Sequence, residues 1–237
     1  LLGRWLKMDW DTALMTSTGS AICGAAAVLG AEPVVKCEAH KTAVAVSTVV
    51  IFGTLSMFLY PIAYRSGLLN LTTEQMAIYT GASLHEVAHV VGAGNAMDPS
   101  GLLHIADQAT ITKMIRVMLL APVLVVMSFV LSKVRSNKSA AKSKKDKITI
   151  PWFAFGFIGI IVLNSTLGAC SFLPKEGLAT CIGWINGLDT FLLTMAMTAL
   201  GTETSLEKFR QAGAKPFYLA SLLYVWLIVG GYFLVKT

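Results

Sequence analysis

The chain has 237 residues, of which 55% are hydrophobic and only 14% are charged, and its mean hydropathy is +0.67. Soluble globular domains contain about 25% charged residues, so this composition excludes an ordinary water-soluble domain. The net charge of +6 does not indicate a nucleic-acid partner, because basic residues beside apolar segments are the usual orientation signal of membrane proteins.

Seven apolar stretches have about the length, 17 to 25 residues, that a helix needs to cross a bilayer. Glu86 and Asp189 are the only charged residues inside them. The stretches cover residues 12–31, 42–64, 75–97, 117–132, 148–174, 177–202 and 216–235. Backbone groups in hydrocarbon must be hydrogen-bonded within the protein, so the sequence predicts an all-α, polytopic transmembrane bundle of about seven spans.

The distribution of Lys and Arg predicts the orientation of these spans. The polar segment 133–147 (KVRSNKSAAKSKKDK) is strongly basic and is expected in the cytoplasm of a bacterial cell, as a loop of a multi-pass inner-membrane protein. Counting outward from it places the residues around Lys7 and Lys215 inside and Thr237 outside. The loop 32–41 departs from the rule, because it would be external although it contains two Lys.

The first residues, LLGRWLKMDWD, lack the apolar region and the cleavage site of a signal peptide, and the chain begins with Leu rather than Met. We therefore expect a piece of a longer membrane protein, which cannot transport when expressed alone. Cys170 and Cys181 lie near the ends of one predicted external loop, where a disulfide is one of two open alternatives.

Polar or flexible residues at membrane depth are costly, and they are therefore candidates for function. The first such group lies in residues 17–27 (STGSAICGAAA), where glycines and hydroxyls interrupt an apolar stretch. A helix broken here would direct the N-terminus of its second half toward an anion. Close packing of small residues against a neighbouring helix is the alternative.

The second group lies in residues 81–95 (GASLHEVAHVVGAGN). His85, Glu86 and His89 match H-E-x-x-H, the zinc-hydrolase signature in which two His bind the metal and the Glu activates water. A third ligand is not evident, because Asn95 stands where the longer zinc-protease pattern has a His. An intramembrane zinc hydrolase is therefore the alternative interpretation of this group.

The third group combines Asn164 with Asp189 and Thr190 of a later span. Asp189 has no basic neighbour in the sequence, so it needs a partner on another helix, protonation, or a place at the membrane surface. An Asp that begins a helix at the level of the lipid headgroups remains an equal alternative.

An internal repeat relates two of these groups. Residues 17–64 consist of a small-residue span, a polar loop and a long apolar span, and residues 189–235 repeat that order. Five spans separate the two broken helices, and an odd number inverts the second copy relative to the first. Inverted repeats with broken helices near the membrane midplane are typical of secondary transporters. We expect residues 1–74 to end a first repeat and residues 75–237 to form the second.

Several strings of the sequence resemble one family along nearly the whole chain. They are GSAICGAAAVLGAEPVVK, TVVIFGT, HEVAHVVGAG, KMIRVMLLAPVL, KITIPWFAF, LDTFLLTMAMTALG, AGAKPF and WLIVGG. In these strings the chain resembles the YeiH family, whose members are described as sulfate exporters. The resemblance departs at His89, where the family has Gln.

The resemblance implies a protein of about eleven helices, of which this chain is similar to the last seven, and a relation to bile-acid and arsenite transporters. The missing N-terminal helices would then be partners of this chain. By the same resemblance, Ser20, Cys23 and Gly24 belong to the S-x-C-G-A-A-A motif of the family, and His85 and Glu86 to its H-E-V-A motif.

The sequence as a whole predicts a secondary transporter or exporter of a small anion such as sulfate or a sulfonate, not an enzyme. The predicted substrate-binding residues are Ser17, Gly19, Ser20, Cys23, Gly24, Ser83, His85, Glu86, Asn164, Asp189 and Thr190. The site is expected between broken helices at 19–24 and 189–201, with His85 and Glu86 as ligand contacts or a proton-coupling pair. The expected partners are the anion, the lipid bilayer and a second copy of the chain, with no metal or other cofactor.

Overall fold

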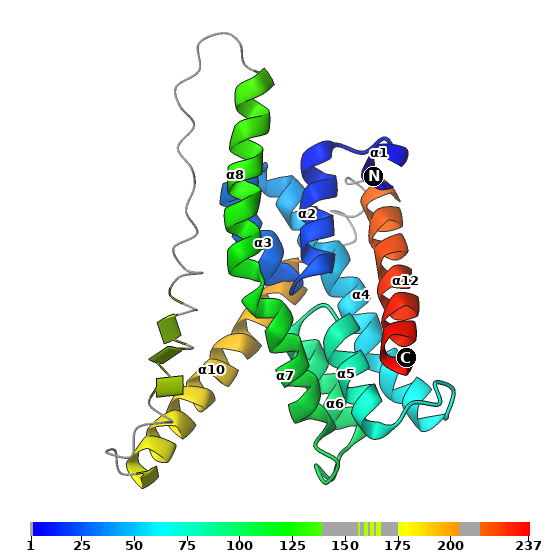
Figure 1. Cartoon of the computed structure of the whole chain (residues 1–237), viewed down its shortest axis with the longest axis vertical. Helices are drawn as coiled ribbons and strands as arrows, with labels where there is room; N and C mark the ends of the chain where they lie inside the picture. Colours follow the sequence, from blue (N-terminus) through cyan, green and yellow to red (C-terminus); the bar gives the residue numbers. More distant parts are fainter. Residues whose placement is uncertain are drawn as a thin grey trace. The chain divides into compact units, whose positions relative to one another are not determined.

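The computed structural model describes residues 2–138, 175–203 and 214–237, with short helical pieces between 156 and 166 (Figure 1). All regular secondary structure in these residues is helical, which confirms the predicted all-α class. The chain divides into a main unit, residues 1–151 with 207–237, and a second unit, residues 152–206. The two units are described separately.

The main unit contains nine described helices. They are α1 (Leu2–Trp5), α2 (Trp10–Ala21), α3 (Ala25–Val35), α4 (Ala39–Arg65), α5 (Thr73–Ser83), α6 (Val87–Met97), α7 (Ile105–Met118), α8 (Leu120–Lys138) and α12 (Ala214–Lys236). Three described segments are long and apolar enough to cross a membrane: α4, α12 and the joined stretch Ile105–Val134 of α7 and α8. Pro122 lacks an N–H and lies in the first turn of α8, directly after the interruption between α7 and α8.

Helix α4 relates the other elements to two ends of the main unit. Its 27 residues correspond to a length of about 40 Å at 1.5 Å per residue. We call its beginning the Lys41 end and its last turn the Tyr64 end. Helix α12 runs parallel to α4, because Lys215 Nζ donates to the carbonyl of Lys7 near the Lys41 end, and Gln75 near the Tyr64 end donates to the carbonyl of Val235.

Helices α2 and α3 form a hairpin that enters from the Lys41 end and returns to it. Each helix is about 17–18 Å long, roughly half of the 30 Å hydrocarbon core. They pack against each other, and Asp9, which caps α2, pairs with Nζ of Lys41 at 3.1 Å. The start of α2 and the start of α4 therefore lie at the same end, which requires α3 to run back along α2.

Helices α5 and α6 form a second hairpin, from the Tyr64 end. Thr73 begins α5 and lies beside Tyr64, with 3.4 Å between their hydroxyl oxygens. Arg65 Nη2 donates to the carbonyl of Ala96, near the end of α6, at 2.5 Å. Helix α4 lies between the two hairpins in the sequence and runs from the Lys41 end to the Tyr64 end. The hairpins therefore enter the main unit from opposite ends. A hairpin followed by a long helical segment occurs twice, in residues 10–65 and 73–138, and the two copies run in opposite directions (Figure 1).

This arrangement corrects two of the predicted spans. Residues 12–31 and 75–97 are hairpins whose helices are each too short to cross, and not single spans. The correction also removes the anomaly of the loop 32–41, because Lys41 lies at the same end as Lys7 and Lys215. Both replaced spans lie between Lys7 and the loop 133–147, so the number of crossings between these two segments stays even and their predicted placement on the same side is unchanged.

The second unit corrects another prediction. Helix α10 (Lys175–Glu203) is continuous, so the break expected in residues 189–201 is wrong. The hydroxyls of Thr190, Thr194 and Thr198 each donate to the carbonyl four residues earlier, and these bonds keep the polar groups within the helix. Most of the predicted span 148–174 lies outside the described residues. The side chains of Cys170 and Cys181 lie outside them as well, so the disulfide between them stays a prediction.

The hairpin at residues 12–31 predicts a specific labelling pattern. In a variant without native cysteines, single cysteines replace Glu38, Leu68, Ser139 or Thr237, and intact cells are treated with a membrane-impermeant maleimide. We expect the thiols at positions 38 and 139 to be protected and those at positions 68 and 237 to be labelled, because α4 crosses between residues 38 and 68. Labelling at positions 38 and 237, with protection at position 68, would restore the single-span topology.

Candidate functional site

The two hairpin tips meet inside the main unit. Ile22, Cys23 and Gly24 join α2 to α3, and Leu84, His85 and Glu86 join α5 to α6. The backbone N–H of Ala25, at the start of α3, donates to Oε1 of Glu86 at 3.1 Å, although 61 residues separate them in the chain. We call residues 22–25 and 84–86, together with the side chains that contact them, the tip site.

Glycine makes the first tip possible. Gly24 has φ +76°, a backbone conformation that side-chain-bearing residues rarely adopt, and a Cβ there would overlap Cγ of Glu86. At Gly19 a Cβ would lie 2.5 Å from Val28 Cγ2 and 2.9 Å from Val49 Cγ2. The absence of side chains at these positions therefore lets α2, α3, α4 and the second tip approach one another.

Two basic residues of α7 hold the C-terminal ends of both inward helices. Lys113 is fully buried, and its Nζ donates to the carbonyl of Ile22 at 3.1 Å and to that of Leu84 at 2.6 Å. Arg116 donates through Nη2 to the carbonyls of Ser20 (3.1 Å) and Ala21 (2.7 Å), and through Nη1 to that of Ala82. The last carbonyls of a helix lack intrahelical partners and carry partial negative charge, so both cations stabilise these ends.

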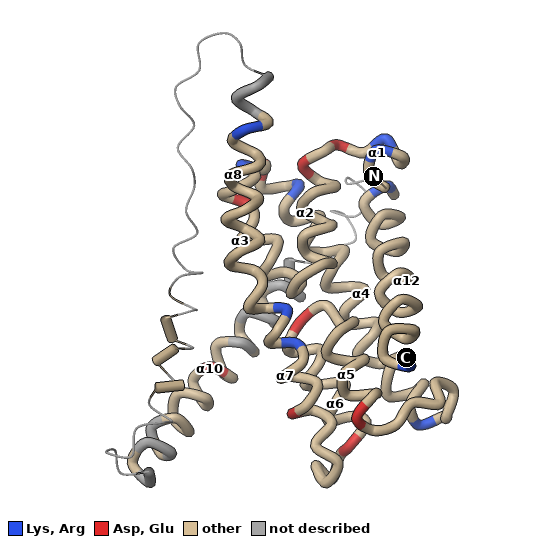
Figure 2. The backbone as a smooth tube through the Cα atoms, viewed as in Figure 1, with Lys and Arg blue, Asp and Glu red and all other residues tan. Residues whose placement is uncertain are grey.

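These cations lie away from the basic residues at the Lys41 end, as the blue segments of α7 in Figure 2 show. The sequence analysis did not select Lys113 or Arg116 as functional residues. The available signal is their i, i+3 spacing, which places both on one face of α7.

The second tip contributes a group of buried ionisable side chains. Their relative exposures are 1% for His85, 2% for Glu86 and 7% for His89. Among the described residues, Oε2 of Glu86 and Nδ1 of each His have no hydrogen-bond partner. His89 Nδ1 lies 3.7 Å from Glu86 Oε2, and its Nε2 lies 3.3 Å from Oγ1 of Thr54. Buried polar atoms without partners are uncommon in proteins, so these three atoms call for a partner such as a water, a ligand or a proton.

His89 packs tightly against α4. A Cβ at Gly53 would lie 2.5 Å from Nδ1 of His89 and 3.6 Å from Cβ of His85. His89, Thr54 and Gly53 are therefore part of the tip site, although the sequence analysis did not select them as binding residues.

The geometry does not support the zinc-hydrolase alternative. The H-E-x-x-H signature requires two His one turn apart on a helix, but α6 begins at Val87, after His85 and Glu86. The ring of His85 instead lies beside that of Tyr224 in α12, with centroids 6.2 Å apart. Within the described part of the chain, no three His, Cys, Asp or Glu side chains are close enough together to hold a metal ion.

The structure brings together most of the predicted binding residues. Gly19, Ser20, Cys23, Gly24, Ser83, His85 and Glu86 lie at or directly beside the two tips, and Ser17 lies on α2. Ser20 Oγ has no described partner. Ser83 Oγ is bonded, because it accepts from Tyr60 at 2.9 Å and donates to the carbonyl of Tyr79, which indicates a structural role.

The remaining predicted binding residues belong to the second unit. Asp189 and Thr190 are exposed on α10, and Thr190 is bonded within its own helix. Asn164 lies outside the described residues. Their predicted contribution to the site remains untested.

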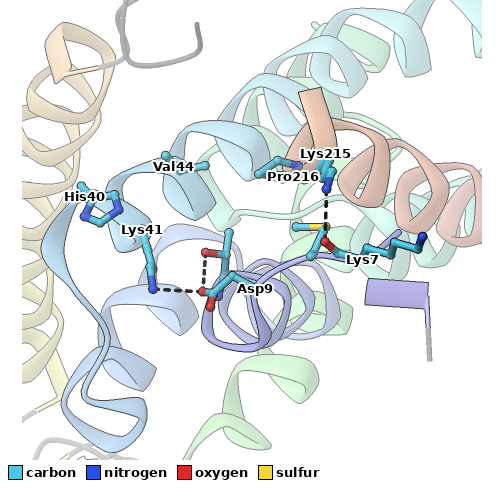
Figure 3. A pocket seen from close by; sticks show the side chains of 9 residues that line it. Lys7, Asp9, His40, Lys41, Val44, Lys215 and Pro216 are labelled. Carbon is cyan, nitrogen blue, oxygen red and sulfur yellow. Dashed lines mark hydrogen bonds and ion pairs between the residues drawn. The ribbon is translucent and has the colours of Figure 1, made fainter. Parts of the chain in front are cut away.

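A separate pocket of about 250 Å³ opens at the Lys41 end (Figure 3). It is lined by Lys7, Asp9, Lys41 and Lys215, among others. Burial opposes ionisation of Asp9, but hydrogen bonds from Lys41 and Thr12 lower the pKa of its carboxyl below the ordinary value. Lys41 is thus paired with Asp9, and Lys215 with the carbonyl of Lys7, so these groups mainly hold α2, α4 and α12 together.

The position of Gly24 predicts a specific loss of stability. Gly24→Ala adds a strained φ and an overlap with Glu86, whereas Gly67→Ala adds a positive φ of 70° with no atom within 4 Å of the new Cβ. We expect the control to cost about 1 kcal/mol and Gly24→Ala clearly more, since it also disturbs the Ala25–Glu86 bond. Thermal unfolding in detergent measures both, and equal melting temperatures would show that the tips do not meet in this way.

The comparison with known proteins agrees with a membrane location. Residues 1–220 match the family model described as conserved hypothetical protein 698. A UPF0324 membrane protein of Bacteroides thetaiotaomicron is 61% identical over 99% of this chain and 66% of its own length. Relatives of the same name from Bordetella bronchiseptica and Haemophilus influenzae are 49% and 45% identical over 98% of this chain, which covers 68% and 64% of them. No solved structure matches. The protein belongs to this family of UPF0324 membrane proteins, of whose length it spans about two thirds.

Proposed function

We propose that this chain is part of a secondary transporter for a small anion, and that the anion binds at the tip site. The observation that carries the proposal is the meeting of two hairpins from opposite ends at two cations, the fully buried Lys113 and the partly buried Arg116. Such a site is within reach of both membrane surfaces if either hairpin moves, which is the requirement of alternating access.

The cost of burying these groups supports a functional role. Charged side chains at membrane depth cost about 2.5–3.5 kcal/mol each on insertion scales, and non-helical backbone is tolerated there only where it is buried in protein or lines a cavity. The tip site contains three such side chains, Glu86, Lys113 and Arg116, and two helix breaks. If this region only packed the helices together, apolar residues and continuous helices would be more stable there.

An anion suits the balance of charge at the tips. Lys113 has three N–H donors, of which two are used for the carbonyls of Ile22 and Leu84. The start of α3 adds the partial positive charge of a helix N-terminus. The resemblance to the YeiH family supports sulfate or a sulfonate as the substrate, in a multi-pass protein of the bacterial inner membrane whose basic loop 133–147 is cytoplasmic.

The proposal also concerns the partners of the chain. The relatives are longer than this chain, so further helices of the full-length protein would enclose the site from the side. Exposed apolar side chains on α8 and α12, such as Phe129 and Trp226, offer surfaces for lipid, those helices or a second copy.

Flux measurements test the proposal directly. Full-length protein is reconstituted into vesicles, and uptake of labelled sulfate is compared with uptake of chloride and of an uncharged solute. We expect Lys113→Gln to lower sulfate flux about tenfold or more, equivalent to at least 1.4 kcal/mol, while Lys133→Gln, an exposed charge on α8, leaves it unchanged. Melting temperatures of both variants control for folding. Equal flux of both variants would remove the tip site from transport.

A further inference from the structure

The two oxygens of Glu86 lie in different surroundings. Oε1 accepts the N–H of Ala25, whereas Oε2 is buried without a hydrogen-bond partner among the described residues. A buried carboxylate oxygen without a donor is costly. Nδ1 of His89 is also buried and without a partner, and it lies 3.7 Å from Oε2.

One proton on Oε2 would satisfy both of these atoms. A protonated carboxyl donates through its O–H, and a neutral His ring accepts at one nitrogen while donating at the other. His89 can accept at Nδ1 while its Nε2–H donates to Oγ1 of Thr54, at 3.3 Å. The present 3.7 Å exceeds an O–H···N hydrogen bond by somewhat less than about 1 Å, so a small movement closes it.

The other groups around Glu86 determine what this proton does to the charge of the site. Lys113 of α7 and Cys23 of the first tip interact with Glu86, and His89 of its own hairpin lies beside it. Arg116 of α7 interacts with Lys113, Cys23 and His85, and Tyr224 of α12 also lies beside His85. With the His, Cys and Tyr side chains neutral, ionised Glu86 leaves the two cations with one positive charge in excess. Protonated Glu86 leaves two.

A buried site binds most readily the ligand that neutralises it, because uncompensated charge is expensive in a low dielectric. A dianion matches the site with Glu86 protonated, and a monoanion matches the site with Glu86 ionised. Binding of the proton and of a dianion therefore favour each other, and the coupling is reciprocal.

We propose that Glu86 is the site of a coupling proton, and that one proton is bound with each divalent oxyanion of about the size of sulfate. The proton enters from water on one side of the membrane and leaves to water on the other. His89 is a positioning residue that accepts the hydrogen bond of the protonated carboxyl. This inference rests on the proposed transport function, adds its coupling ion and restricts its substrate to divalent oxyanions.

Sulfate binding to the full-length protein at different pH values tests this inference. Isothermal titration calorimetry between pH 5.5 and 8.5 should show an affinity that rises as pH falls, by up to about tenfold per pH unit where Glu86 is ionised without ligand. Glu86→Gln mimics the protonated carboxyl, so its affinity should be independent of pH. Glu74→Gln removes an exposed carboxylate from the same hairpin and should keep the pH dependence of the unaltered protein.

Variants of the two histidines identify the group that carries the proton. Gln can form hydrogen bonds but cannot take up a proton near neutral pH, so His85→Gln and His89→Gln should retain the pH dependence of sulfate binding. His89→Leu removes the acceptor for the Glu86 proton, so it should move the pH dependence to lower pH. Loss of the dependence in a His→Gln variant, with its retention in Glu86→Gln, would place the proton on that His and overturn the inference.

Proton uptake by the unaltered protein provides a test that needs no variant. A pH indicator in weak buffer should report close to one proton taken up per sulfate bound at a pH where Glu86 is ionised. Sulfate flux without proton uptake or pH dependence would contradict the coupling proton and leave the transport function intact. Absence of binding and flux for every anion at all pH values would contradict the transport function itself.

Discussion

The hydrogen bonds of Lys113 are the interaction on which the rest of the structure depends. One ammonium group, fully buried, joins the carbonyl of Ile22 to that of Leu84 and thereby ties the end of α2 to the end of α5. Without a cation here, two sets of helix-terminal carbonyls would face each other in an apolar interior. Arg116 donates further hydrogen bonds to the same two helix ends. Glu86 accepts a hydrogen bond at the start of α3, where it contributes a negative charge. The ends of α2 and α5 and the start of α3 thus each face a side chain of opposite charge.

This arrangement explains why the hairpins stop where they do. A short helix that ends inside a membrane leaves carbonyls or N–H groups unpaired, and only another part of the protein can satisfy them. The two tips satisfy each other through α7, so neither hairpin is complete alone. In the proposed transport cycle, a movement of one hairpin exposes Lys113, Arg116 and Glu86 together, and this exposure connects opening of the site with binding of the anion and of the proton.

Part of this structure can be predicted from the sequence. The apolar stretches predict the helical class, and Gly19 and Gly24 predict the first break, because both the left-handed backbone and the close approach need glycine. The sequence does not show whether the chain continues or returns after a break, since that depends on which surfaces pack together. The two Lys of the loop 32–41 are the one local signal of a return. The second break was missed because His85, Glu86 and His89 match a helical motif, and a break was instead predicted in α10, where threonines bond within the helix.

The central claim is that residues 12–31 and 75–97 are hairpins whose tips meet at Lys113. A cryo-electron microscopy map of the full-length protein in lipid nanodiscs measures this most directly. The account predicts two interrupted segments that return to opposite membrane surfaces, with Nζ of Lys113 within hydrogen-bond distance of the carbonyls of Ile22 and Leu84. Two continuous helices crossing the bilayer at these residues, with Lys113 facing lipid or water, would contradict it.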